Sequence, residues 1–363
     1  MMRTDVLVVG ASVIGGVAAK ELAQKGIQTT LLSEKAHVGK GGKCTSIISA
    51  AGLEKTGIGF REAVVHEIFG ANVRCGKARL KVRTKKPVAH VLNRFTLDAL
   101  SVQQAQDAGA RLVVDARFSS WHEKTAETKA GKIRADVLVG ADGVGSTVAH
   151  ACGFPKLSNL VVAWEGEFEG AALSDPDVVD VFLDYPGLFA WAVPAGLQTV
   201  RIGLAVRPPH DLAFYKRRLL LDPVVAGMRS GASLAREFYH AIPLSYRRKT
   251  QLGDVCLVGD AAGQTKATTG GGIVFGSLCA GELAASVKDH LVGTPLGYEA
   301  RWRQKYASVL DAHRLIRRTL DVVPFGVSAF GLSALKAIGF GGFLEKKGDM
   351  DFIVRSPGYF RHV

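Results

Sequence analysis

The order of apolar and polar residues near the N-terminus predicts a strand, a tight turn, a helix and a second strand. The stretch DVLVVGASVIGGVAAKELAQKGIQTTLLSEK, residues 5–35, starts with an apolar run, changes to helical periodicity after Gly10 and returns to an apolar run after Gly26. Gly10 permits the turn, and Gly15 lets the helix pack closely on the strand. The pattern therefore predicts a βαβ unit whose helix N-terminus offers free amides to an anion.

Two later stretches repeat a related pattern, which is a hydrophobic strand, an aspartate, small residues and the start of a helix. They cover residues 133–153 and 257–276. Together with the N-terminal unit they predict one nucleotide-binding domain assembled from discontinuous segments. The stretch between them, about 155–250, is rich in Val, Phe and Trp with turn breaks and predicts a β-sheet substrate domain. From about residue 278 the pattern is mostly helical.

These patterns predict an α/β fold class with three parts. A Rossmann-like, discontinuous domain takes residues 1–154 and 251–290, the β-sheet substrate domain takes residues 155–250, and a helical C-terminal region takes residues 291–363.

Glu34, at the end of the second strand, lies where a carboxylate accepts hydrogen bonds from a ribose in dinucleotide-binding domains. Ser12 stands where the second glycine of the G-x-G-x-x-G fingerprint is expected. The glycines alone are therefore a weak signal, and the strand, helix and acidic residue around them carry the prediction of a bound dinucleotide. The alternative is a plain α/β turn.

Composition and net charge limit the classes of partner that this protein is expected to bind. The chain has 363 residues, 47% of them hydrophobic, which is enough for a large core and two domains. Its 46 basic and 33 acidic residues give a net charge of +13 and favour nucleic acid, an acidic lipid surface or a phosphorylated substrate. No nucleic-acid motif accompanies the charge, so nucleic acid is not an expected partner.

One basic segment is concentrated enough to be considered separately. Arg79, Lys81 and Arg83 alternate with Leu80 and Val82, which is strand periodicity with a basic face. Two interpretations are open: a solvated sheet face, or contact with lipid or substrate phosphates.

The cysteines and the apolar runs indicate the compartment. Five scattered cysteines show neither metal-ligand spacing nor a disulfide framework, which predicts a reducing compartment and no metal site. No secretory signal precedes the first strand. The best candidate for a membrane span, residues 322–335, is broken by Pro324, Gly326 and Gly331 and is too short to cross a bilayer. Cytoplasmic localisation is expected, with contact at a membrane surface left open.

Three segments in order resemble FAD-dependent enzymes of the para-hydroxybenzoate-hydroxylase fold: G-x-S-x-x-G with Glu34, then ADG-x-x-S at 141–146, then GDAAG at 259–263. Within that group GDAAGQTKATTGGGI resembles the geranylgeranyl reductase family, and YPGLFAWAVP at 185–194 is similar to its aromatic-x-Trp-x-x-Pro substrate motif. The resemblance extends from Asp5 to residue 303. It implies FAD as the cofactor and transfer of hydride from flavin N5 to an isoprenoid C=C bond of a geranylgeranyl or other polyprenyl lipid.

The resemblance also implies which residues line the cofactor and the substrate. Asp260 would bind the ribityl or pyrophosphate region, and the backbone amides of residues 270–273 would face the flavin and stabilise its negative charge on reduction. Phe189, Trp191 and Pro194 would contact the prenyl chain. The implied FAD-binding residues are Gly10, Ser12, Ile14, Gly15, Glu34, Cys44, Thr45, Arg94, Ala116, Asp260, Gly271, Gly272 and Ile273.

Cys44 is the candidate catalytic residue, because the resemblance puts it on a loop facing the flavin. Its thiol would assist protonation of the substrate carbon or gate the ring. The alternative is a small buried side chain without a chemical role.

A prenyl lipid substrate implies peripheral contact with a membrane. Arg314, Arg317 and Arg318 lie at helical spacing on one face, and the apolar, glycine-rich segment 322–347 follows them. This combination is typical of surface contact with anionic headgroups. Packing of this helix over the substrate domain is the alternative.

Two other functions remain possible at this point: a flavin monooxygenase that hydroxylates or epoxidises a hydrophobic substrate, and a basic nucleic-acid- or membrane-binding module with a vestigial flavin fold. The external electron donor is open among ferredoxin, a deazaflavin, a quinol and NAD(P)H. Ala149, Gly263 and Ala267 depart from the Arg, His and Pro of hydroxylase relatives, which argues against NADPH as the direct reductant.

Overall fold

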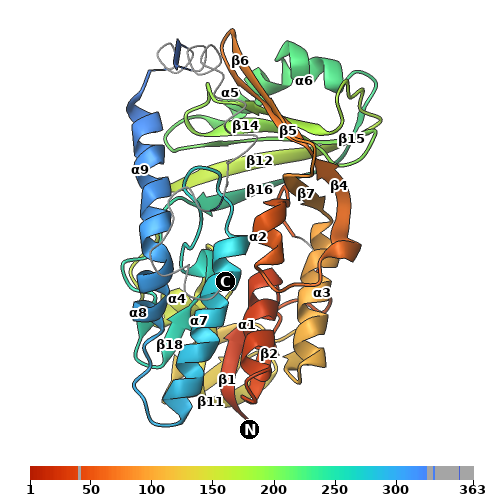
Figure 1. Ribbon diagram of the computed structural model, residues 1–363. Coiled ribbons are helices and arrows are strands. Elements are labelled where there is room, and N and C mark those ends of the chain that lie inside the picture. The colour runs from red at the N-terminus through yellow and green to blue at the C-terminus, as the bar shows by residue number, and fades with distance from the viewer. Residues whose placement is uncertain (40–41, 325–329, 332–350, 352–363) are drawn as a thin grey trace.

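The computed structural model describes residues 1–39, 42–324, 330–331 and 351. Figure 1 shows two β-sheets, one below the other, with helices packed against each of them. The lower sheet contains β1, β2, β11 and β18, and the upper sheet contains β12, β14, β15 and β16. The helix α9 (Ser308–Val322) runs along one side of both.

Eight of the described strands form the lower sheet, and its parallel core has the order β18-β11-β1-β2-β8. The central strand β1 pairs with β11 on one side and β2 on the other, both parallel, and the apolar run Val6–Val9 is buried on both faces. Such burial is typical of a parallel sheet covered by helices. The strands are β1 (Met2–Val9), β2 (Thr29–Leu32), β8 (Arg111–Val113), β9 (Phe118–His122), β10 (Thr125–Thr128), β11 (Gly131–Gly140), β17 (Gln251–Leu252) and β18 (Val255–Leu257).

Three helices cover one face of this sheet, and Figure 1 shows α1 (Val13–Ala23) between α3 (Arg94–Asp107) and α7 (Ile273–Leu291). Val6 and Val8 of β1 pack on this side in the largest cluster of buried apolar residues, which includes Phe275 of α7. Leu7 and Val9 face the opposite side, where they pack with residues of β9, β10 and the short helix α4 (Thr147–Ala151). The alternation along β1 therefore places the core on both faces of the sheet.

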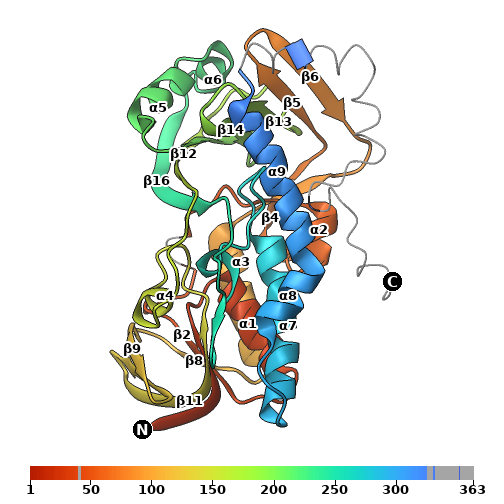
Figure 2. The same ribbon diagram turned by 90° about the vertical axis from the view of Figure 1, so that its left-hand side faces the viewer.

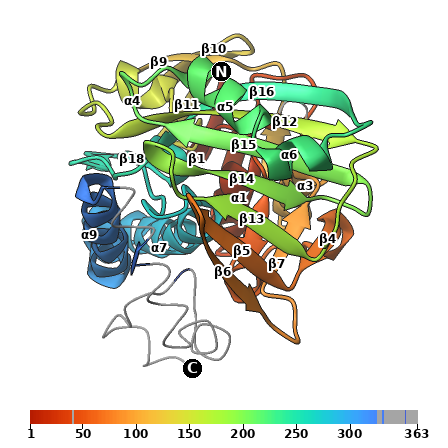
Figure 3. The same ribbon diagram turned by 90° about the horizontal axis from the view of Figure 1, so that it is seen from above.

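The upper sheet has seven strands among the described residues, in the order β16-β12-β15-β14-β13-β5-β6, and Figure 3 shows them side by side from above. Helices α5 (Leu212–Leu220) and α6 (Pro223–Met228) cover its outer face, away from the lower sheet (Figure 2). The strands are β5 (Gly70–Cys75), β6 (Ala78–Arg83), β12 (Leu160–Glu169), β13 (Val178–Phe182), β14 (Gly187–Pro194), β15 (Thr199–Val206) and β16 (Ser233–Pro243).

A small three-stranded sheet with the order β3-β7-β4 joins the two larger ones. Its last strand in the chain, β7, leads directly into α3, and its first, β3, follows the loop that carries Cys44. These elements are β3 (Ile47–Ser49), α2 (Ala50–Glu54), the 3₁₀ turn η1 (Arg61–Ala63), β4 (Val64–Ile68) and β7 (Ala89–Leu92).

The predicted fold class, an α/β protein with a Rossmann-like domain, a second β-sheet and C-terminal helices, is confirmed. The expected domain boundaries stay a prediction. The upper sheet draws two of its strands, β5 and β6, from before residue 155.

The basic face of β6 lies against acidic residues. Lys81 Nζ lies 3.2 Å from Asp175, and Arg83 contacts Asp175 at 2.8 Å and Asp177 at 3.2 Å. These ion pairs offset part of the positive charge and agree with a solvated sheet face.

The C-terminal helices differ from the expectation at one point. Arg317 is buried, its Nε pairs with Asp321 at 2.9 Å, and its Nη1 donates to the carbonyl of Leu188 at 3.0 Å. Arg318 is exposed. Of the three arginines expected on one face, Arg317 is therefore buried and ties α9 to the upper sheet, which agrees with the alternative that this helix packs over the substrate domain.

The segment 322–347 lies almost entirely outside the described residues. Within the described part of the chain, no helix has the length and apolar character needed to cross a bilayer.

Trp302 fastens the C-terminal helices to the lower domain, and this leads to a stability prediction. The residue ends α8 (Tyr298–Trp302), is fully buried, and its indole Nε1 donates to Thr250 Oγ1 at 2.8 Å. We expect Trp302→Ala to lower the free energy of unfolding by about 3–5 kcal/mol through the lost burial and the cavity it leaves. Denaturant titration of the holoprotein measures it.

Leu315→Ala is the matched control for Trp302→Ala, because Leu315 lies on α9 with 66% of its surface exposed. This change should alter the free energy of unfolding by about 0.5 kcal/mol or less. Equal losses in the two variants would contradict a structural role for the Trp302 contact.

Candidate active site

Glycines bring the start of α1 close to the end of β1. Gly10 has φ +111°, and a Cβ atom on it would lie 2.5 Å from the carbonyl oxygen of Ala141. A Cβ atom on Gly15 would lie 1.7 Å from the carbonyl oxygen of Gly10. The N-cap residue Ser12 makes no capping hydrogen bond within the described residues, whereas Asn93 caps α3. The first turn of α1 therefore offers backbone amides beside a turn that only glycine can form.

Arg94 is held over this N-terminus. Its Nη2 donates to Ser12 Oγ at 2.8 Å and its Nε to Asp98 Oδ1 at 2.9 Å. Asp98 Oδ1 also accepts from Ser12 Oγ at 3.0 Å and from the backbone amide of Val13 at 2.9 Å. Burial acts to lower the pKa of Arg94, but the negative charge of Asp98 more than compensates, so its pKa is raised and the guanidinium stays charged. A charged guanidinium beside a helix N-terminus suits a diphosphate.

Asp260 lies at the corresponding end of α7. It belongs to the 3₁₀ turn η2 (Gly259–Ala261) after β18, and a Cβ atom on Gly272 would lie 2.5 Å from its Oδ1. Burial raises the pKa of Asp260, while Arg94 acts in the opposite direction. Gly272 caps α7 without a side-chain hydrogen bond in the described structure, and the amide of Gly276 is the one that bonds back to its carbonyl. The amides of residues 273–275 therefore precede the intrahelical bonds and suit a ligand.

The remaining residues implied for the nucleotide lie nearby. Ile14, in the first turn of α1, is next to Gly259, because a Cβ atom on that glycine would lie 3.0 Å from its Cγ2. Glu34 follows β2 and is exposed. Ala116 is buried, and its amide donates to the carbonyl of Ser33 at 2.8 Å, so it lies beside the end of β2.

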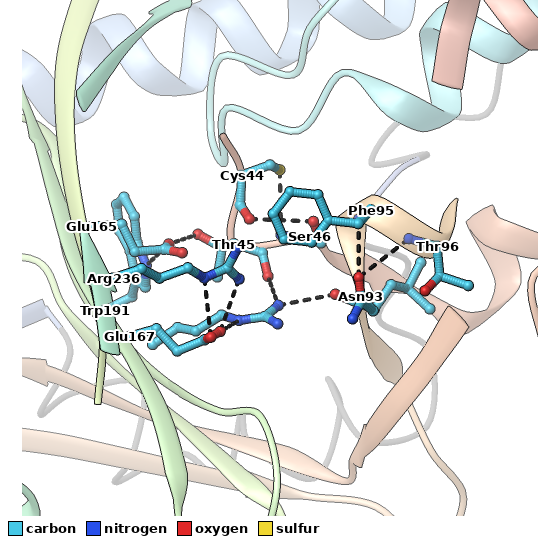
Figure 4. Close-up of polar contacts among 12 residues, drawn as sticks. Cys44, Thr45, Ser46, Asn93, Phe95, Thr96, Glu165, Glu167, Trp191 and Arg236 are labelled. Carbon is cyan, nitrogen blue, oxygen red and sulfur yellow. Dashed lines mark hydrogen bonds and ion pairs between the residues drawn. The ribbon is translucent and has the colours of Figure 1, made fainter. Parts of the chain in front are cut away.

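The loop that carries Cys44 is fastened to the upper sheet through Thr45, as Figure 4 shows. The hydroxyl of Thr45 hydrogen-bonds to Glu165 of β12. The carbonyl oxygen of Thr45 accepts from Arg201 Nη1 at 2.7 Å. Cys44 itself is partly exposed, and its sulfur accepts from the amide of Ser46 at 3.3 Å. Two residues of the substrate-domain sheet thus fix the backbone and side chain next to the candidate catalytic thiol.

Two carboxylates of β12, two residues apart, have opposite environments. Glu165 is fully buried, and burial raises its pKa to about 7, although the Thr45 hydroxyl and the charge of Arg201 act to lower it. Burial also acts to raise the pKa of Glu167, but its ion pairs with Arg236 at 2.9 Å and Arg201 at 2.7 Å lower it overall. At neutral pH Glu167 is ionised, whereas Glu165 lies near the midpoint of its titration.

The residues of the implied substrate motif lie on β14. Phe189 and Trp191 share one face, with ring centroids 5.8 Å apart in a T-shaped arrangement. Trp191 Nε1 donates to Glu165 Oε2 at 3.0 Å, so the motif meets the carboxylate that also binds Thr45. Pro194 is the last residue of β14, and the alternation of the strand puts it on the opposite face from Trp191.

Four residues of this site were absent from the sequence expectations: Asp98, Glu165, Glu167 and Arg201. Asp98 stands four residues after Arg94 on a helix, a spacing that indicates an ion pair. Glu165 and Glu167 lie two residues apart in an otherwise largely apolar strand. This pattern could have indicated from the sequence that both acids lie on one face of the sheet. Arg201 carries no such signal, because its partners come from distant strands and loops.

These features fit FAD. Neither N-cap residue, Ser12 of α1 or Gly272 of α7, makes a side-chain cap, and a Cβ atom on the glycines of these turns would collide with backbone or with Asp260. With the charged Arg94, these N-termini suit a long, anionic cofactor that contacts main-chain amides. Roles of the individual residues remain predictions.

Comparisons with known proteins agree with a flavin site. Residues 3–177 match the family model described as FAD binding domain. The chain is 29% identical over 342 residues to digeranylgeranylglycerophospholipid reductase of Methanothrix thermoacetophila, covering 86% of each chain. It is 27% identical over 341 residues to the protein of that name from Methanocaldococcus jannaschii, covering 87% of this chain and 86% of the relative.

Solved structures share the fold. A geranylgeranyl bacteriochlorophyll reductase-like protein from Thermoplasma acidophilum superposes with a TM-score of 0.83 at 20% identity, covering 96% of this chain and 92% of that one. A p-nitrophenol 4-monooxygenase from Pseudomonas putida superposes with a TM-score of 0.74 at 17% identity, covering 93% and 95%. The resemblance to the geranylgeranyl reductase family, FAD as the cofactor, and the assignment as an FAD-dependent oxidoreductase are confirmed.

The Gly15 contact predicts a cofactor-binding defect. In Gly15→Ala the added Cβ would lie 1.7 Å from the Gly10 carbonyl oxygen, so the turn must open. We expect the affinity for FAD to fall at least tenfold, which corresponds to about 1.4 kcal/mol. Flavin absorbance per purified chain and fluorescence titration of the apoprotein with FAD measure this loss.

The control for Gly15→Ala is Gly281→Ala, the same substitution in α7 at a position where a Cβ atom meets nothing within 4 Å. Alanine favours the helix there, so FAD content should match the wild type. Full FAD affinity in Gly15→Ala would show that this turn does not shape the cofactor site.

Proposed function

We propose that this FAD-dependent oxidoreductase of the geranylgeranyl reductase type reduces isolated C=C bonds in a geranylgeranyl or other polyprenyl lipid. The observation that carries the proposal is the meeting of Trp191 and Thr45 at Glu165, which puts the aromatic substrate motif against the loop of the candidate thiol. The names of the relatives from Methanothrix thermoacetophila and Methanocaldococcus jannaschii support a prenyl lipid as the substrate class.

The chain's own residues have four tasks in this reaction. Reduced FAD, when bound, supplies the hydride for one alkene carbon. Arg94 and the first turn of α1 hold the diphosphate, and the amides at the start of α7 face the ring system. Phe189 and Trp191 wall the prenyl chain and exclude water, which an unactivated alkene needs for alignment. Cys44 is placed to assist protonation of the second carbon.

A second function, hydroxylation or epoxidation of a hydrophobic substrate by a flavin monooxygenase, shares the fold. The likeness to the Pseudomonas putida monooxygenase supports the fold alone. Oxygen dependence separates the two functions, because a reductase turns over without oxygen and a monooxygenase does not.

An anaerobic single-turnover experiment tests the proposed reduction. The purified yellow protein is reduced chemically, a geranylgeranylglyceryl phosphate ether lipid is added, and flavin absorbance and the lipid mass are followed. We expect the flavin to become oxidised without oxygen and the lipid to gain two hydrogens for each bond reduced. Flavin that stays reduced until air is admitted would overturn the reductase proposal in favour of the monooxygenase.

Variants of two partly exposed cysteines accompany this experiment. Cys44→Ala should slow flavin reoxidation, expressed per bound flavin, by about tenfold or more, because general acid assistance contributes at least this much. Cys152→Ala is the matched control, since Cys152 follows α4 in the chain, on the face of the lower sheet away from α1. Equal rates in the two variants would leave Cys44 without a chemical role.

A prenyl lipid has to be taken from a bilayer, so we also propose peripheral membrane contact. Leu315 and Val322 are 66% and 78% exposed, and with the exposed Arg318 they lie on one side of α9. An apolar strip with a cation suits insertion among anionic headgroups.

Vesicle binding tests this contact. The double variant Leu315→Asp/Val322→Asp should lose most of its co-sedimentation with vesicles of phosphatidylglycerol and phosphatidylcholine, because two carboxylates replace inserted apolar groups. Phe214→Asp is the control, since Phe214 is an exposed apolar residue on α5. Unchanged binding of the double variant would exclude α9 as the contact.

A further inference from the structure

Glu165 is a buried acid that the proposed mechanism has not yet used. It lies in the middle of β12, between β15 and β16, and faces the loop of Cys44 and Thr45. Its Oε2 accepts from Trp191 Nε1 and contacts the Thr45 hydroxyl. Its Oε1 is buried and has no hydrogen-bond partner among the described residues. A carboxylate left in this state would be costly, whereas a neutral acid needs fewer partners.

The charged groups around Glu165 do not provide a counter-ion of its own. Among the described residues, Arg201 from β15 and Arg236 from β16 face it, and both form ion pairs with Glu167. Burial therefore outweighs their attraction, and the pKa of Glu165 rises to about 7. The proton of this acid is exchangeable near neutral pH, unlike that of Glu167, whose pKa is lowered.

Thr45 is the link from this buried acid to the candidate site. The carboxyl is fully buried, but Thr45 and Cys44 are partly exposed. A hydroxyl both donates and accepts hydrogen bonds, so Thr45 can take a proton from Glu165 and release its own toward the side of the loop that carries Cys44. The hydrogen bond from Arg201 to the Thr45 carbonyl fixes the backbone that carries this hydroxyl.

We propose that Glu165 stores the proton that the alkene takes up, and that the hydroxyl of Thr45 relays it to the active-site loop. This inference rests on the proposed function. The π bond breaks and two C–H bonds form: the hydride, which carries both electrons, would come from reduced FAD, and the proton passes from Glu165 by way of the Thr45 hydroxyl to the second carbon. Glu165 becomes a carboxylate and regains its proton from solvent before the next turnover. Glu165 and Thr45 are positioning residues, because they act through the loop.

A purely structural role is the competing explanation. In that case Glu165 only anchors Thr45, and any side chain that accepts the same hydrogen bonds would serve. Glu165→Gln keeps an acceptor for Trp191 and Thr45 but carries no exchangeable acid proton. Thr45→Val removes the relay hydroxyl, and Thr45→Ser restores it.

The pH dependence of anaerobic flavin reoxidation by the prenyl lipid tests the relay. In the wild type the rate should fall as pH rises through about 7, because Glu165 loses its proton there. Expressed per bound flavin, the rates of Glu165→Gln and Thr45→Val should be at least about tenfold lower at pH 6 and should lose this fall. Thr45→Ser should return to within about threefold of the wild type.

Infrared spectra and thermal unfolding of the holoprotein give readouts that need no substrate. A protonated-carboxyl band should disappear as pH rises through about 7 and be absent in Glu165→Gln. The folded pKa is raised, so the stability from this acid is present below its ordinary pKa and lost as pH rises through 7. The melting temperature of Glu165→Gln should therefore fall less than that of the wild type between pH 5 and pH 8.

The outcomes separate this inference from the function it rests on. A wild type that the lipid does not reoxidise would overturn both. An active wild type with Glu165→Gln and Thr45→Val following the same pH profile would overturn the relay alone. A lost pH dependence in both variants, with rescue by Thr45→Ser, would support it.

Discussion

Arg201 is the residue on which the arrangement of the site depends. Its guanidinium leaves β15, pairs with Glu167, and donates to two backbone carbonyls, that of Thr45 at 2.7 Å and that of Leu92 at 3.0 Å. Leu92 ends β7, and Asn93 next to it caps the helix that begins with Arg94. One buried cation of the upper sheet thus fixes both the loop of the candidate thiol and the strand end that aims Arg94 at α1.

The anchoring role of Arg201 explains why a guanidinium and a carboxylate are buried at this point of the upper sheet. A buried guanidinium is costly unless its donors are satisfied, and here Glu167 and two carbonyls satisfy Arg201. Arg201 and Arg236 both form their ion pairs with Glu167, so the neighbouring Glu165 has no ion pair of its own among the described residues. The different protonation of two acids on one strand therefore follows from where the arginines are placed, and the same contacts that position the loop leave a titratable acid beside it.

The sequence predicted the parts of this protein that depend on neighbours along the chain. The βαβ unit, the turn at Gly10 and the two later stretches of strand, aspartate and helix start are all local patterns, and the fold class followed from them. The contacts of Glu165 with Thr45 and of Arg201 with Leu92 could not be predicted, because strand register and loop docking set them over more than a hundred residues.

Long-range packing also reverses a local pattern at Arg317. Helical spacing placed Arg317 with Arg314 and Arg318 on a face expected to contact a membrane, but its side chain is buried, pairs with Asp321 and donates to a carbonyl of β14. Strand alternation puts Pro194 on the face of β14 opposite Trp191, a distinction that the sequence motif alone does not make.

The loop before α7 adds a constraint on which chemistry this chain supports. Gly263 has φ +75°, and a Cβ atom on it would lie 2.4 Å from the carbonyl oxygen of Ser245. The histidine of the hydroxylase pattern would therefore need a strained backbone and a displaced neighbouring strand end. Ala267, at the position of the hydroxylase proline, is fully buried in the cluster that includes Trp191. The loop is thus packed in the same apolar cluster as Trp191, and the hydroxylase residues would not fit here without a change in the backbone.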